Sequence, residues 1–128
     1  MSYAVNPQLL AEILHTVEAV RIGNSGRVRV CARRMVGFAL ESLADYNGIN
    51  AMGILNRIAT DTSLPADIRA DASTLLQGIR DYAAEGFGNT TPVKTALRLI
   101  SAIRPDILLC LQQSDEFKQL DHELSIKR

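Results

Sequence analysis

The chain has 128 residues, of which 47% are hydrophobic and only 5% aromatic, and it has no tryptophan. This length predicts one domain, residues 1–128, that buries a core without disulfides or metal ions. A core drawn from Ala, Leu and Ile favours helices over a β-sandwich. The 14 basic and 14 acidic residues give a formal net charge of zero. That balance excludes the overall basic charge typical of nucleic-acid-binding proteins, so such a function would need a local patch.

The first helix is predicted to begin at Asn6-Pro7, because asparagine is a good N-cap and proline is favoured at the first helical position. It ends at Gly23. The turn over residues 23–26 is short, so the first two helices form an antiparallel hairpin. Ser25 is expected to cap the second helix.

The second helix, at about residues 26–46, is predicted to be the central element of the fold. When successive residues are placed about 100° apart around the helix, its main apolar residues fall in one stripe. This stripe is wide enough to form the core face of a helix. Its members are Val28, Ala32, Met35, Val36, Ala39, Leu43 and Tyr46. On the other side, Val30, Gly37 and Ala44 recur every seven residues. Small residues at this spacing admit another backbone, so we expect an interface there, with either the chain's own elements or a second copy.

Four arginines cluster near the start of this helix: Arg27, Arg29, Arg33 and Arg34. The helix macrodipole disfavours cations at this end, and like charges four residues apart repel. Either each guanidinium is compensated within the fold, by a carboxylate of a neighbouring helix or by lying over apolar surface, or the cluster binds an anion such as a nucleotide or nucleic acid. Of the 14 basic residues 11 are arginine, which suits bidentate pairing.

The remainder of the chain also reads as helical. The third to sixth helices are expected at about residues 51–60, 65–84, 92–103 and 106–117, and the charged tail at 118–128 either frays or continues as helix. Phe87, between two glycines, lies in a loop that bends sharply or presents the ring to a partner. No segment alternates as a strand does. The predicted fold is therefore an all-α bundle of five to six helices around the central one.

Groupings of residues that would mark an enzyme are missing from the sequence. His15 and His122 are far apart, and there is no His-x-x-x-His pair, Glu-x-x-His pair or cysteine cluster. No glycine-rich phosphate loop or nucleophile elbow occurs. We therefore expect no catalytic residue, metal or cofactor. Asp67 and Asp71 are expected at the surface, paired with Arg69 or with the arginines of the central helix.

The two cysteines and the chain's hydropathy indicate the compartment. Cys31 and Cys110 lie in apolar helical stretches without C-x-x-C spacing, as free buried thiols do in a reducing cytoplasm. The N-terminal stretch lacks the basic and apolar regions of a secretory signal. No apolar run approaches the roughly 18 residues that span a bilayer. We expect a cytoplasmic protein that does not bind membranes.

The stretch from Val17 to Asp45 combines a helix, a short Gly/Asn turn and an Arg- and Ala-rich helix. It resembles the opening hairpin of HEPN domains, helical bundles often found beside nucleotidyltransferases or acting as ribonucleases. The resemblance covers less than a quarter of the chain. The catalytic HEPN signature, an arginine followed four to six residues later by a histidine, is absent. The resemblance therefore implies binding or dimerisation rather than RNA cleavage.

Three functions remain open from the sequence. The first is a non-enzymatic interaction module that forms a homodimer or docks a protein partner. The second is a nucleic-acid or nucleotide binder that uses Arg27, Arg29, Arg33 and Arg34. The third is an enzyme whose site is assembled from scattered residues.

Overall fold

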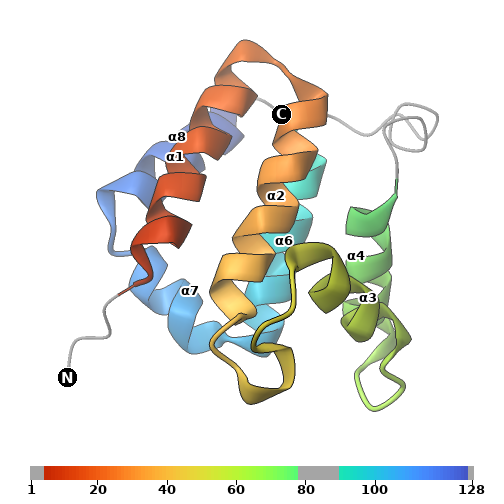
Figure 1. Cartoon of the computed structure of the whole chain (residues 1–128). Helices are drawn as coiled ribbons and strands as arrows, with labels where there is room; N and C mark the ends of the chain where they lie inside the picture. Colours follow the sequence, from red (N-terminus) through yellow and green to blue (C-terminus); the bar gives the residue numbers. More distant parts are fainter. Residues whose placement is uncertain (1–4, 78–89, 127–128) are drawn as a thin grey trace.

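The computed structural model describes residues 5–77 and 90–126, and in these residues the regular secondary structure is helical with no strand (Figure 1). The all-α prediction is therefore confirmed. The α-helices are α1 (Pro7–Ile22), α2 (Ser25–Leu40), α3 (Ala51–Thr60), α4 (Ala66–Leu76), α6 (Thr91–Ile103), α7 (Pro105–Leu111) and α8 (Asp115–Ile126). A 3-10 helix, η1 (Ala44–Tyr46), lies between α2 and α3. The described part thus holds seven α-helices, more than the five to six expected.

The α1–α2 hairpin forms where the sequence predicted it. The Asn6 side chain caps α1 by accepting a hydrogen bond from the Gln8 backbone N–H. Gly23 ends α1 in the left-handed region, at φ 74°, where glycine has no Cβ to clash. The N-cap of α2 is Asn24, whose Oδ1 accepts from the Arg27 N–H at 3.1 Å. The expected cap, Ser25, is instead the first residue of the helix.

The second helix ends earlier than predicted, at Leu40, and the chain then turns into η1. The predicted end at Tyr46 was wrong. Tyr46 is nevertheless buried, and Leu43 packs against the core from the turn. Apolar spacing thus predicted positions that reach the core, but Leu43 is only partly buried, and neither it nor Tyr46 of η1 belongs to a continuous α2.

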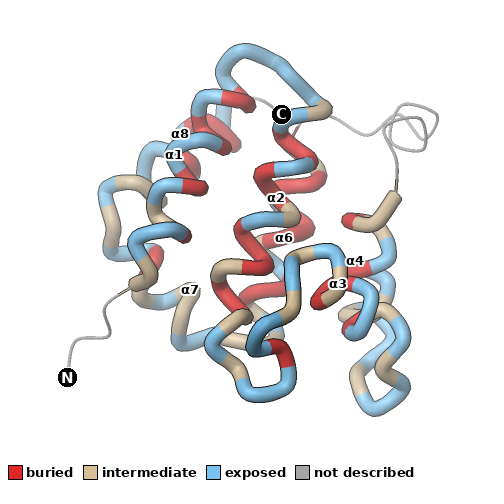
Figure 2. Tube along the Cα trace, in the orientation of Figure 1, coloured by how far each residue is buried: buried red, intermediate tan, exposed pale blue. Residues whose placement is uncertain are grey.

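Helix α2 packs against α1, α3 and α6 and touches α4. Buried positions are concentrated along its length (Figure 2). Helix α4 packs on α3 and α6, while α1 packs on α8, so the first and last described helices lie side by side. The core consists mainly of Leu, Ile, Val and Ala, as the composition predicted.

The predicted sixth helix is divided in two. Helix α7 ends at Leu111, and the Ser114 hydroxyl then accepts from the Phe117 N–H at 3.1 Å to start α8. Helix α8 includes residues 118–126 of the expected tail and buries Leu120 and Leu124. Of the two predicted alternatives for these residues, the structure has the helical one.

The predicted fourth helix is shorter than expected. Its last residue is Leu76, and Gln77 has an extended backbone (ψ 152°), so the prediction of one unbroken helix to Ala84 was wrong. Residues 78–84 and Phe87 lie outside the described residues.

Candidate functional site

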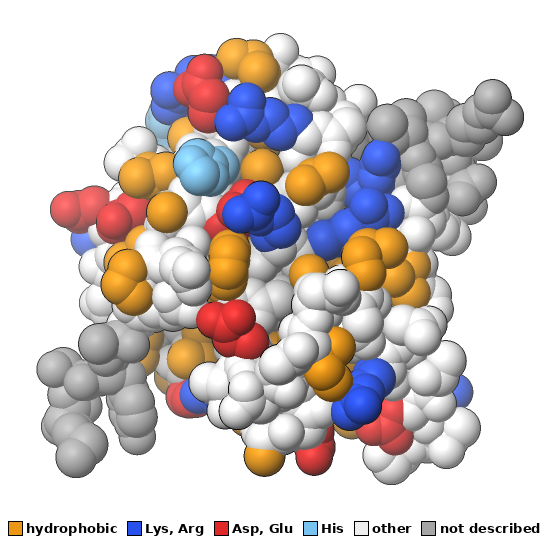
Figure 3. Space-filling model, in the orientation of Figure 1, with side chains coloured by type: hydrophobic (Ala, Val, Ile, Leu, Met, Phe, Trp, Pro, Cys, Tyr) orange, Lys and Arg blue, Asp and Glu red, His pale blue; other side chains and the backbone are white. Residues whose placement is uncertain are grey.

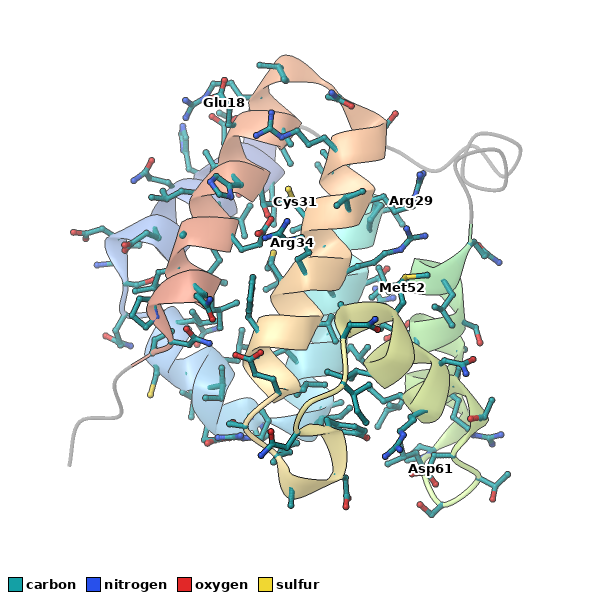
Figure 4. The ribbon with its side chains drawn as sticks, viewed as in Figure 1. Glu18, Arg29, Cys31, Arg34, Met52 and Asp61 are labelled. Carbon is teal, nitrogen blue, oxygen red and sulfur yellow. The ribbon has the colours of Figure 1, made fainter. Side chains whose placement is uncertain are left out.

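The four arginines of α2 divide between its two flanks. Figure 4 shows Arg34 in the space between α1 and α2, whereas Arg29 projects on the opposite side, the side that also carries Met52. Basic side chains gather over this part of the molecule, with hydrophobic side chains between them (Figure 3). The cluster is therefore a broad surface rather than one converging pocket.

Arg34 compensates a buried carboxylate. Its Nε lies 3.0 Å from Oε1 of Glu12, and the Glu12 side chain is only 3% exposed. The guanidinium also lies 5.7 Å from the centre of the Phe38 ring, within the range of a cation–π contact. A buried carboxylate without a partner is costly. The expected carboxylate partner thus exists for Arg34, although it comes from α1 and not from Asp67 or Asp71.

Arg33 is compensated by backbone rather than by an acid. Its Nε donates to the carbonyl of Leu75, and its Nη2 donates to the carbonyl of Gln77 at 2.8 Å. These carbonyls are at the C-terminal end of α4, where helix geometry leaves acceptors unsatisfied and the macrodipole favours a cation. Arg33 therefore caps α4 from a neighbouring helix.

Arg27 and Arg29 differ from the other two. In the part of the chain that the structure describes, no ion pair involves either side chain. Arg29 is only 9% exposed, and its buried Nε has no hydrogen-bond partner. Arg27 is exposed. Internal compensation thus accounts for two of the four arginines, whereas Arg27 is exposed to solvent and Arg29 is buried without an ion pair among the described residues.

The proposed interface residues do not form one stripe. Val30 is 46% exposed. Gly37 is buried. It faces the start of α3 so closely that a Cβ built there would lie 2.9 Å from the Cβ of Ala51. Ala44 is exposed but belongs to η1, so the seven-residue spacing does not extend along α2. The close approach at Gly37 is therefore made by the chain's own α3.

Two shallow hollows open along α2, and Arg34 lines both. The first, of about 250 Å³, lies between α1 and α2 and is also lined by Glu12, His15, Arg27, Val30 and Cys31. The second, of about 260 Å³, lies between α2 and the start of α3 and includes Phe38, Ile49 and Ala51. The second hollow is lined mostly by apolar surface. Both have the size of a site for one or two side chains rather than for a large cofactor.

The first hollow brings together a thiol, an imidazole and a carboxylate, but the thiol is not activated. Burial, followed by the neighbouring Glu12, raises the pKa of Cys31 to about 11. A thiol is nucleophilic only as the thiolate, so Cys31 is protonated and inert at neutral pH. His15 Nδ1 lies 3.7 Å from Glu12 Oε1. The group therefore has no activated nucleophile.

The predicted pairing of Asp71 was wrong. Its carboxylate binds Arg98 of α6 in a bidentate manner, with Nη2–Oδ1 at 2.9 Å and Nε–Oδ2 at 3.3 Å. This hydrogen bond raises the pKa of Arg98. Arg69 instead donates to the Leu64 carbonyl, and Asp67 accepts from the Ile68 N–H. Neither aspartate compensates the arginines of α2.

Comparison with models of known protein families found no match, and comparison with curated proteins and with solved structures found no significant similarity. The resemblance of Val17–Asp45 to HEPN domains therefore stays a prediction. Among the described residues no group of three or more His, Cys, Asp or Glu is placed to hold a metal ion. None of the described helices has the length and apolar character needed to cross a bilayer.

Proposed function

We propose that the chain is a single-domain helical bundle arranged around α2, and that it acts in the cytoplasm as a non-enzymatic interaction module. It docks a protein partner or a second copy through the α2 face, which we define by Arg27, Arg29, Val30, Arg34 and Met52. The observation that carries this proposal is the exposure of Val30, which lines the first hollow, and of Met52 near the start of α3, each 46%.

The α2 face has features of protein interfaces. Interfaces are enriched in methionine and arginine, and their strongest contacts are side chains that fill pockets. Here exposed apolar side chains alternate with arginines, and Arg34 separates two hollows that each suit a partner side chain. The lack of an activated nucleophile in the first hollow supports binding over catalysis.

Site-specific cross-linking tests this proposal. A photoreactive residue at position 30 is compared with one at Ile126, an aliphatic position on α8 that is more accessible, at 60% against 46% exposed. We expect position 30 to capture a defined protein, either this chain or another, and light scattering on the purified chain to separate those cases. Cross-linking no stronger at position 30 than at position 126 would overturn the proposal.

A second candidate function, anion binding, is favoured by one observation: the buried Nε of Arg29 has no acceptor. Such binding is steeply salt-dependent. Arg27→Ala and Arg29→Ala are the informative variants, since Arg33 and Arg34 hold α4 and Glu12. If RNA or nucleotide binding is undetectable at about 50 mM salt, or is unchanged in both variants, this candidate is excluded.

A further inference from the structure

We infer that the α2 face takes an acidic amphipathic peptide segment: carboxylates lie against Arg27 and Arg29, and apolar side chains lie against Val30, Met52 and the hollow beside Phe38. This inference rests on the proposed function and names the chemistry of the partner.

The charge of the two helices that carry the face is of one sign. Neither α2 nor α3 contains an aspartate or glutamate, whereas together they carry five arginines: Arg27, Arg29, Arg33, Arg34 and Arg57. Two acids lie beside these helices: Glu12 of α1, which is paired with Arg34, and Glu41, which directly follows α2, lines the hollow beside Phe38 and accepts a hydrogen bond from the Asn6 side chain. Hydrogen bonds from Arg33 to carbonyls satisfy its N–H groups without removing its charge. An approaching partner therefore meets a local excess of positive charge in a chain that is neutral overall.

Arg29 is the residue with which a partner carboxylate forms its strongest contact. It is more than nine-tenths buried, and its Nε lacks an acceptor. Removal from water strengthens its interaction with any charge that reaches it. A partner carboxylate that reaches the exposed edge of this guanidinium forms a charge-assisted hydrogen bond, which is stronger than a neutral one.

The apolar part of the face favours a peptide over a nucleic acid. By its position along α2, Val30 lies between the two arginine flanks, and it is 46% exposed. Met52 is exposed on the side of Arg29 (Figure 4). The hollow lined by Phe38, Ile49 and Ala51 offers mostly apolar surface. A phosphate backbone leaves these surfaces unfilled, whereas an amphipathic helix places apolar anchors in such grooves at helical spacing.

The same charges disfavour a two-fold dimer across this face. In a two-fold interface the same patch meets itself. The dimer would place Arg27 and Arg29 of one copy against the basic face of the other, and like charges across an interface are unfavourable. The occupant is therefore a separate acidic segment rather than a symmetry-related α2 face.

Selection from a displayed library of random peptides about 15 residues long, roughly four helical turns, tests the inference on the full chain. We expect enriched peptides to combine Asp or Glu with apolar residues three and four positions apart. Replacing their acids with the corresponding amides should weaken binding at least about tenfold, and this loss should shrink at high salt.

Variants of the chain then locate the site. Val30→Asp and Arg27→Gln change exposed positions, and each should weaken binding several-fold; Arg29→Gln should weaken it most. Lys94→Gln, an exposed charge on α6, should have no effect and is the matched control. Should Arg29→Gln not fold by circular dichroism, the two exposed variants still decide.

The outcomes separate this inference from the function on which it rests. Enriched peptides without an acidic bias, or binding insensitive to Val30→Asp and Arg27→Gln, overturn the acidic partner while cross-linking from position 30 still supports an interaction module. If no peptide is selected and RNA binds through Arg27 and Arg29, the acidic-peptide inference is overturned and the second candidate function, anion binding, is supported. No enrichment together with no cross-link from position 30 overturns both.

Discussion

Arg33 and Arg34 are adjacent in the chain, yet they stabilise opposite sides of α2. Arg34 pairs with Glu12 of α1, and Arg33 caps α4 through two carbonyls. The sequence predicted that these charges need compensation, because the local energetics of four arginines at a helix start are unfavourable. It did not predict the partner of Arg33, because every residue has a backbone carbonyl and no residue type marks one that is left free.

Replacing Arg33 tests its capping role. Arg33→Ala leaves the Leu75 and Gln77 carbonyls without these donors, and we expect a loss of about 1–3 kcal/mol in the free energy of unfolding. Arg27→Ala, an exposed arginine of the same helix, is the control and should change stability by less than about 0.5 kcal/mol. Urea denaturation measures both, and equal effects would contradict the assignment.

The ionisation of Cys31 is expected to lower the free energy of unfolding at alkaline pH. Its pKa rises from 9.0 to about 11 on folding, so the folded state prefers the neutral thiol. This stabilisation is complete below about pH 9 and is lost as pH rises through about 11, because the unfolded chain ionises first. The full shift corresponds to at most about 2–3 kcal/mol.

The Cys31→Ala variant isolates this contribution. In urea unfolding at a series of pH values, the stability advantage of the natural chain over the variant should shrink between about pH 9 and pH 11. A gap that stays constant over this range would show that the Cys31 thiol does not titrate differently in the two states.

At the scale of elements, the contact between α2 and α3 depends on the absence of a side chain at Gly37. A Cβ there would lie 2.9 Å from the Ala51 Cβ and 3.3 Å from its Cα. Alanine gains about 1 kcal/mol in helix propensity, but it forces the start of α3 to move. We expect Gly37→Ala to destabilise the protein by about 1–2 kcal/mol net.

A second substitution, at Ala51, should restore the stability that Gly37→Ala removes. Ala51→Gly removes the atom that the new Cβ meets, so the double variant should recover most of the loss in a double-mutant cycle measured by urea denaturation. If Gly37→Ala is more stable than the natural chain, helix propensity dominates and the close contact is not needed.

Helix starts were more predictable than helix ends in this chain. Asn6-Pro7 and the turn at residues 23–26 have clear local chemistry, and α1 and α2 begin within a residue of the prediction. Leu43 and Tyr46 continue the helical apolar period although α2 has ended, because both pack against the core from the segment that leads into and forms η1. At the end of α4, the carbonyls of Leu75 and Gln77 accept hydrogen bonds from Arg33, which lies far away in sequence.

For the molecule as a whole, the helical class follows from composition and periodicity, but the pairing of α1 with α8 does not. Their contact depends on tertiary packing, in which Arg21 of α1 lies 3.0 Å from Glu123 of α8. Neither residue has a pattern that identifies the other. The same reason explains why the sequence predicted the arginines and Val30 of the α2 face but not Met52, which α3 brings beside them.

The docking of α8 should contribute to global stability. Leu120 is fully buried, and Leu120→Ala should cost about 2–5 kcal/mol. Ile126→Ala, at an exposed position of the same helix, should cost less than about 0.5 kcal/mol. Thermal unfolding followed by circular dichroism compares the two, and similar small losses would show that α8 is not part of the cooperative unit.

The α1–α8 pairing also has a consequence for synthesis. Arg21 and Glu123 are 102 positions apart, so the ribosome completes α1 long before it synthesises α8, the helix that packs on it. The α1–α2 hairpin is able to form early from local contacts, but the flank of α1 that packs on α8 faces water until α8 emerges. A nascent chain without α8 therefore exposes this flank to chaperones and proteases.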